Sequence, residues 1–85
     1  MPYISEEGKL TLREIERKHN LSTLAVAAIA CVEPSMVYWM EQGGSLARED
    51  VERILRSLSQ VTGQHYTSET VGGYWVTVGG ESMNR

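Results

Sequence analysis

Residues that start and stop helices divide the segment 11–44 into three short pieces, and this division constrains the fold more than any other feature of the chain. Each piece begins with a capping residue or a proline and ends where the next residues favour a turn. Helices this short are marginal in isolation, so they must pack against one another. The sequence therefore predicts a compact set of short helices over the ranges 12–19, 23–30 and 34–42.

The first two helices have well-defined starts. Thr11 and Glu14 have the spacing of a capping box, and Asn20 tolerates the left-handed conformation at a helix end. Ser22 can cap the second helix, which is rich in alanine. Because alanine side chains are small, we expect this helix to approach its neighbours closely.

The third and fourth helices follow from a proline and from an apolar stripe. Pro34 suits a first helical position, and Gly43-Gly44 ends the third helix. The fourth helix starts either after a Ser45 cap or at Arg48, and it ends at Gly63. Its apolar side chains recur at three- and four-residue steps, which places them on one face: Val51, Ile54, Leu55, Leu58 and Val61. The stretch from Thr67 can add one more helical turn.

The C-terminal segment differs in character. Tyr74–Val78 is an aromatic and β-branched run between two glycine pairs, which is typical of a strand. A lone strand leaves its backbone groups unpaired. Because residues 1–8 lack a strong partner strand, we expect Tyr74–Val78 to pair with its copy in a homodimer. Ser82–Arg85 is expected to form a frayed tail.

Composition excludes several classes of protein. The formal net charge is −3, which does not favour nucleic acid, although Lys9, Arg13, Arg17 and Lys18 form a local basic cluster. The single cysteine cannot form an internal disulfide, and we expect Cys31 to be a small buried side chain. The longest apolar run has about nine residues, whereas a membrane-spanning helix needs about 20. We therefore expect no membrane association and a cytoplasmic location.

The segment Leu12–Gly43 resembles the Cro and lambda-repressor type of helix-turn-helix family, also called xenobiotic-response-element type regulators. The family pattern is roughly L-R-x-x-R-x-x-x-x-L-S-x-x-x-L-A-x-x-x-G-V-S-x-x-x-I-S-x-x-E-x-G, and it aligns without gaps. The matching residues are Leu12-Arg13, Leu21-Ser22, Val26-Ala27, Val32, Val37, Glu41 and Gly43. The resemblance implies that Glu41 pairs with Arg13 or Arg17, and that Val26, Val32 and Val37 fill the core between two helices.

The resemblance also implies DNA binding, with the third helix in the major groove. Phosphate contacts then fall to Arg13, Arg17, Lys18 and Thr23, and base contacts to Ser35, Met36, Tyr38 and Trp39. None of the four base-facing residues forms the bidentate pairings that read guanine or adenine. Cys31 also replaces the turn glycine, so the bend can differ in shape.

Two interpretations of these residues remain open. Tyr38 or Trp39 can pack in the core, or both can belong to an exposed patch with Met36 and Met40 that binds a protein. The cations of the first helix can contact phosphate, or they can form an ordinary solvated face.

Catalysis and cofactors are not expected. The sequence has no nucleophile–base pair and no cluster with metal-ligand spacing, and we expect His19 and His65 at the surface. The two glycine pairs that flank Tyr74–Val78 also lack the surrounding sequence of a phosphate-binding loop.

Taken together, these patterns predict an all-α fold: a compact helix-turn-helix domain of four or five helices over 10–71. A leader over 1–9 precedes it, and a strand-like segment with a tail over 72–85 follows it. The expected function is DNA binding by a small transcriptional regulator that forms a homodimer. The alternative is the same scaffold used for protein interaction through Met36, Tyr38 and Trp39, without sequence-specific DNA binding.

Overall fold

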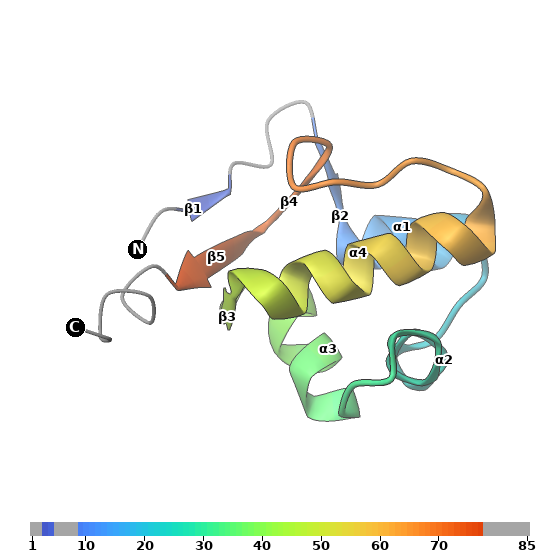
Figure 1. Cartoon of the computed structure of the whole chain (residues 1–85), viewed down its shortest axis with the longest axis horizontal. Helices are drawn as coiled ribbons and strands as arrows, with labels where there is room; N and C mark the ends of the chain where they lie inside the picture. Colours follow the sequence, from blue (N-terminus) through green and yellow to red (C-terminus); the bar gives the residue numbers. More distant parts are fainter. Residues whose placement is uncertain (1–2, 5–8, 78–85) are drawn as a thin grey trace.

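The computed structural model describes residues 3–4 and 9–77, which contain four helices and five short strands. The helices are α1 (Leu12–Lys18), α2 (Thr23–Ala30), α3 (Pro34–Glu41) and α4 (Arg48–Thr62). The strands are β1 (Tyr3–Ile4), β2 (Leu10–Thr11), β3 (Ser45–Ala47), β4 (Val71–Gly72) and β5 (Tyr74–Thr77). In Figure 1, α2 and α3 lie together at one end, and α4 runs across the molecule above them.

Local capping sets the helix starts, as the sequence predicts. Thr11 Oγ1 accepts a hydrogen bond from the Glu14 amide at 3.2 Å, and Glu14 Oε1 accepts one from the Thr11 amide at 2.9 Å. Ser22 Oγ accepts from the Ala25 amide at 3.0 Å. Both predicted caps are therefore confirmed.

The prediction of an all-α fold is wrong, because the chain is a mixed α/β protein. One sheet has three strands in the order β1-β5-β3, and β2 pairs with β4 in a second, two-stranded parallel sheet. Four of the five strands have only two or three residues. Segments this short carry no visible alternation of apolar and polar residues, so only the pairing of distant backbone groups defines them.

The strand β5 lies in the middle of the three-stranded sheet. It pairs antiparallel with β1, where Tyr3 lies opposite Trp75, and parallel with β3, where Leu46 lies opposite Val76. β5 thus finds partners within its own chain on both sides, including one from the expected leader. The expectation that residues 1–8 offer β5 no partner strand is therefore wrong, and β5 does not need a second chain to pair. Dimerisation itself stays a prediction.

The predicted ends of α4 are confirmed at Arg48 and at Gly63, but the alternative start after a Ser45 cap is wrong. α4 begins at Arg48 after Ala47, while Ser45 belongs to β3, so Ser45 does not cap it. Gly63 ends α4 with a φ of 79°, a conformation that favours glycine. The stretch from Thr67 makes a single turn, in which the Thr70 and Val71 amides both donate to the Thr67 carbonyl at 3.0 Å, and no fifth helix forms in the described residues. The expected Ser82–Arg85 tail lies outside them.

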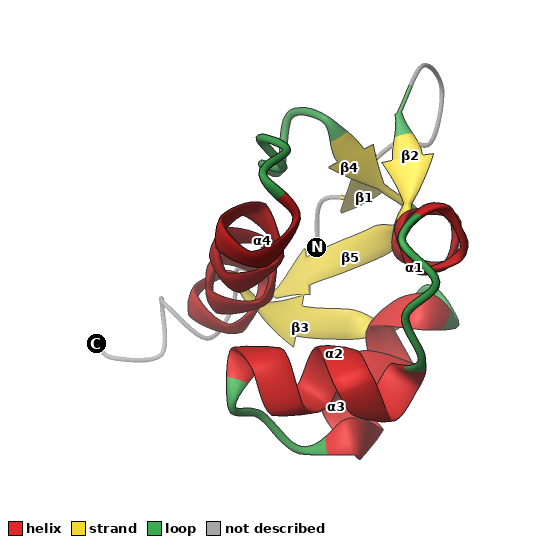
Figure 2. Ribbon diagram, turned by 90° about the vertical axis from the view of Figure 1, so that its right-hand side faces the viewer, coloured by secondary structure: helices red, strands yellow, loops and turns green. Residues whose placement is uncertain are grey.

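The core is shared by the helices and the sheet. Figure 2 shows β5 and β3 between α4 on one side and α1 on the other, with α2 and α3 below. The apolar stripe of α4 is buried except for Val61, and Tyr74 of β5 is completely buried beside it in the same cluster. The strand after Gly73 is thus part of the core and not an appendage to it.

Candidate recognition surface

The turn between α2 and α3 uses a cysteine in a conformation that usually favours glycine. Cys31 has φ 60° and ψ 44°, in the left-handed region. Its amide donates to the carbonyls that end α2, and the next amide, of Val32, donates to the Ala27 carbonyl at 3.0 Å. The bend therefore keeps the left-handed geometry that we expected cysteine to disfavour. Cys31 is also exposed, not buried as predicted.

The helix α3 presents two large aromatic side chains to solvent. Val37 and Met40 are fully or almost fully buried, and they hold one face of α3 against the core. Neighbouring positions on a helix point about 100° apart. Tyr38 and Trp39 consequently lie outside the core, 55% and 53% exposed. The interpretation in which one of them is a core residue is wrong.

The other predicted base-facing residues separate into two kinds. Ser35 is exposed, whereas Met36 is half-buried and packs against the core cluster. Met40, the fourth member of the expected patch, is only 2% exposed. The exposed surface of α3 is thus smaller than the sequence predicted, and Tyr38 and Trp39 dominate it.

Trp39 is also part of a groove. Its indole lies against Gly44 so closely that a Cβ at Gly44 would overlap the ring. The groove has a volume of about 430 Å³ and runs between α3, β3 and the first turn of α4. Met36 and Leu46 contribute apolar surface to it, and Glu33 and Asp50 contribute the only charged groups among its described lining residues.

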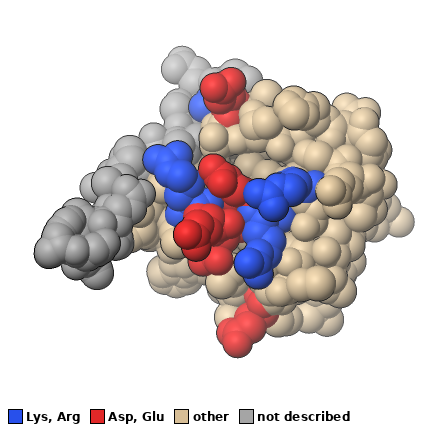
Figure 3. All heavy atoms as spheres, in the orientation of Figure 1, with Lys and Arg blue, Asp and Glu red and all other residues tan. Residues whose placement is uncertain are grey.

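The cationic side chains predicted to contact phosphate lie on α1, not on α2 or α3. Arg13, Arg17 and Lys18 are exposed on α1, but the sequence has no lysine or arginine from His19 to Ala47, the stretch that contains α2 and α3. Figure 3 shows basic and acidic groups side by side on the face that α4 crosses, with no broad area of one sign. The helices α2 and α3 and the turn between them therefore have no lysine or arginine side chains.

Thr23 has a structural role in this arrangement. Its hydroxyl donates a hydrogen bond to Glu41 Oε2 at 2.7 Å, which ties the start of α2 to the end of α3. The resemblance implied that Glu41 pairs with Arg13 or Arg17 and that Thr23 contacts phosphate. The Thr23 hydroxyl is instead bonded to Glu41.

A second carboxyl faces Glu41 from α1. Glu16 is only 9% exposed, and none of the described residues donates a hydrogen bond to its Oε2. Burial, a hydrogen bond with Glu41 and the negative charge of Glu41 raise the pKa of Glu16 to about 8, while Arg13 opposes this shift. This shift favours the protonated form of Glu16, which can donate a hydrogen bond to Glu41. The sequence reasoning missed this pair, although Glu16 occupies the position of the second arginine in the family pattern.

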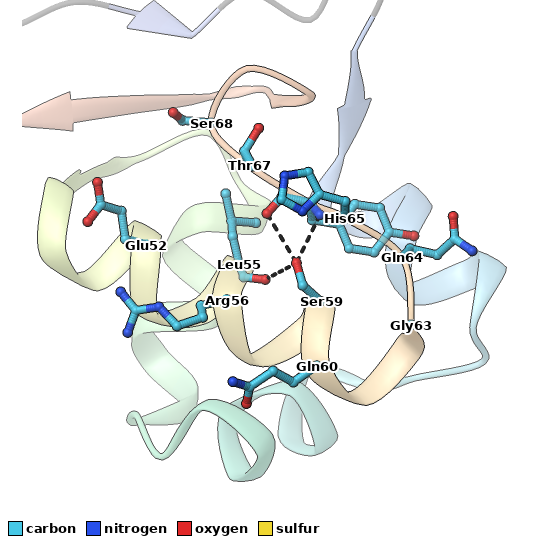
Figure 4. A pocket seen from close by; sticks show the side chains of 11 residues that line it. Glu52, Leu55, Arg56, Ser59, Gln60, Gly63, Gln64, His65, Thr67 and Ser68 are labelled. Carbon is cyan, nitrogen blue, oxygen red and sulfur yellow. Dashed lines mark hydrogen bonds between the residues drawn. The ribbon is translucent and has the colours of Figure 1, made fainter.

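A second depression lies between α4 and the loop that follows it (Figure 4). It has a volume of about 630 Å³ and is lined mainly by polar side chains, including Glu52, Arg56 and His65. Ser59 lies at its base, where the hydroxyl donates to the Leu55 carbonyl at 2.8 Å and accepts from the Tyr66 amide at 2.9 Å. These bonds fasten the loop to α4, which gives Ser59 a structural role.

The two histidines have different environments. His65 is exposed, as predicted. His19 is half-buried, and its Nε2 lies 2.8 Å from the Tyr66 hydroxyl, with the two rings in an edge-to-face arrangement. His19 is thus less exposed than predicted, because the loop after α4 folds back onto α1 and brings Tyr66 against its ring.

Within residues 3–4 and 9–77, no group of three or more His, Cys, Asp or Glu side chains is placed to hold a metal ion. No helix in the same residues has the length and apolar character needed to cross a membrane. No family model, no curated protein and no solved structure matches the chain. The resemblance to the helix-turn-helix family consequently stays a prediction.

Proposed function

We propose that this chain is a protein-interaction module that binds its partner through the exposed surface of α3. The observation that carries the proposal is the exposure of Tyr38 and Trp39 on a helix whose opposite face is fixed in the core. Aromatic residues are enriched at the centres of protein interfaces, where they contribute much of the binding energy. A small domain that exposes two of them on one short helix has a surface suited to a partner.

Charge supports a protein partner over DNA. Affinity for duplex DNA depends largely on lysine and arginine side chains that displace counterions from phosphates. α2 and α3 contain none, and the carboxylate of Glu33 is exposed at the start of α3. A phosphate near that end of α3 would meet a full negative charge, which outweighs the positive end of the helix dipole of about half a charge.

A peptide-selection experiment tests the proposal. The protein is immobilised, peptides are selected from a random library, and each enriched peptide is measured against Tyr38→Ala. We expect Tyr38→Ala to weaken binding by about tenfold or more, as for a central interface residue. Val61→Ala is the matched control, because Val61 is also an exposed apolar side chain, 59% exposed, on α4. Equal binding to wild type and Tyr38→Ala would show that α3 is not the interaction surface.

DNA binding by a transcriptional regulator is the second candidate. The cations Arg13, Arg17 and Lys18 favour it because they are exposed on α1. The hydroxyl of Thr23, by contrast, is already bonded to Glu41. Its test is the affinity for a mixed-sequence duplex measured over a range of salt concentrations. DNA binding predicts a steep loss of affinity with salt, and a slope that Arg17→Gln reduces by about one. No binding at low salt would exclude this candidate.

A further inference from the structure

Three kinds of lining group meet in the groove beside Trp39: an aromatic ring, apolar side chains and carboxylates. An aromatic ring forms one wall, since Trp39 is fixed against Gly44 yet 53% exposed. Apolar surface comes from Met36 on α3 and Leu46 on β3. Carboxylates come from Glu33, at the start of α3, and Asp50, in the first turn of α4.

The two carboxylates are available to a ligand. Glu33 is the N-cap residue of α3, but its side chain makes no capping hydrogen bond, and Glu33 is exposed. Asp50 is half-buried, and no ion pair or hydrogen bond joins its side chain to another described residue. No lysine or arginine lines the groove in the described part of the chain. The groove is therefore negative, because two full charges exceed the half-charges of the two helix ends.

A cation with a long apolar stem fits these groups. A guanidinium or ammonium group over the face of a tryptophan is attracted by the ring, and the attraction adds to that of the carboxylates. The stem of an arginine or lysine side chain lies on apolar surface while its charged end remains near polar groups. Met36 and Leu46 offer such a surface next to the ring.

We infer that this groove binds an arginine or lysine side chain of a protein partner. The inference rests on the proposed function and specifies the chemistry of the partner: a basic segment that crosses α3 beside Tyr38. Charge complementarity decides the occupant. A phosphate or acidic peptide would be repelled by Glu33 and Asp50, and a purely apolar side chain would remove water from those carboxylates without pairing them.

Two capped peptides test the inference: one with three Gly-Arg repeats and one with three Gly-citrulline repeats. Citrulline has nearly the shape of arginine without its charge. Each peptide is titrated into isotopically labelled protein while the indole N–H signal of Trp39 is followed by NMR. We expect the arginine peptide to shift this signal and to bind at least about tenfold more tightly than the citrulline peptide, with an affinity that falls as salt rises.

Variants locate the charge that the peptide recognises. Asp50→Asn and Glu33→Gln keep the shape of each side chain, and each should weaken the arginine peptide by about fivefold. Glu52→Gln is the matched control, because Glu52 is an exposed carboxylate on α4 that lies outside this groove. Equal weakening by Glu52→Gln would mean a general charge effect and would overturn the inference.

The outcomes for the inference and for the proposed function are distinct. Equal binding of the two peptides, or no shift of the Trp39 signal with either, would overturn the cation site. In that case peptides selected from the library that still depend on Tyr38 would leave the proposed function in place. Selected peptides that bind independently of Tyr38 would overturn the proposed function itself, whatever their charge.

Discussion

Replacing Glu16 with glutamine tests the carboxyl pair that joins α1 to α3. Glu16 is buried beside Glu41, and Glu41 is held in place by the Thr23 hydroxyl, so three helices meet at this pair. Ionisation of Glu16 would place a buried negative charge beside the half-buried carboxylate of Glu41. Glutamine has almost the same shape, carries no charge and can still donate a hydrogen bond to Glu41.

The direction of the pH effect follows from the two states of Glu16. Its pKa is about 8 in the folded chain against an ordinary value of 4.5, so the folded chain binds this proton more tightly than the unfolded chain. The stabilising contribution of the proton is complete below pH 4.5 and is lost as the pH rises toward 8. The wild-type protein should therefore lose stability across this window through Glu16, whereas Glu16→Gln should not.

The size of the effect follows from the shift in pKa. A shift of one unit corresponds to about 1.4 kcal/mol, which gives roughly 5 kcal/mol as an upper limit for the whole shift. Rearrangement of the two carboxyls and entry of water reduce this value, so we expect about 2–3 kcal/mol. Such a change is a large part of the total stability of a small domain.

Urea denaturation at a series of pH values measures this contribution. The free energies of unfolding of wild type and Glu16→Gln should agree within about 0.5 kcal/mol near pH 5 and differ by about 2–3 kcal/mol near pH 8.5, with the variant more stable. Glu52→Gln is the control, because Glu52 is exposed on α4 and should change stability little at any pH. A difference between wild type and Glu16→Gln that stays constant from pH 5 to 8.5 would refute the reasoning.

Three further substitutions test other features of the fold. Cys31→Gly relieves a left-handed conformation at φ 60° and should raise the free energy of unfolding by about 0.5–1 kcal/mol. Ala28→Gly, at an exposed position of α2, should lower it by about 1 kcal/mol. Thermal unfolding by circular dichroism compares the two variants, and a Cys31→Gly variant less stable than wild type would contradict the account of the turn. Gly44→Ala places a methyl group in the space of the Trp39 ring and should lower the free energy of unfolding by about 1–3 kcal/mol, as measured by urea denaturation. An unchanged urea midpoint would mean that the ring moves aside freely. Tyr74→Phe removes a buried hydroxyl that has no hydrogen-bond partner among the described residues, so stability should stay within about 0.5 kcal/mol or rise; a loss above about 1.5 kcal/mol would reveal a bonded hydroxyl.

Part of the candidate site was predictable because helix positions follow from local rules. Once α3 was predicted to begin at Pro34, its periodicity required Tyr38 and Trp39 to point away from each other and from Val37. Whether either ring is covered depends on what packs beside α3, and the sequence does not identify such a neighbour. The structure supplies it: β3 and Gly44 lie along one side of α3 and fix the Trp39 ring there.

The carboxyl pair and the groove could not be predicted for the same reason. Glu16 and Glu41 are 25 positions apart, and Glu33 and Asp50 are separated by an entire helix and a strand. A charged residue in a sequence is by default solvated, and only the packing of other elements shows that Glu16 is removed from water. The arginine of the family pattern at that position was the one available signal.

The sequence by itself determined the helices, because capping residues, a proline, glycines and the apolar stripe of α4 act within a few residues of the bonds that they make. The tertiary structure alone decided the sheets, the burial of Tyr74, the pairing of Glu16 with Glu41 and the shape of the groove beside Trp39. Strands of two or three residues have too few side chains to specify a partner. They exist because folding brings distant backbone groups together, and those groups must pair once water is excluded.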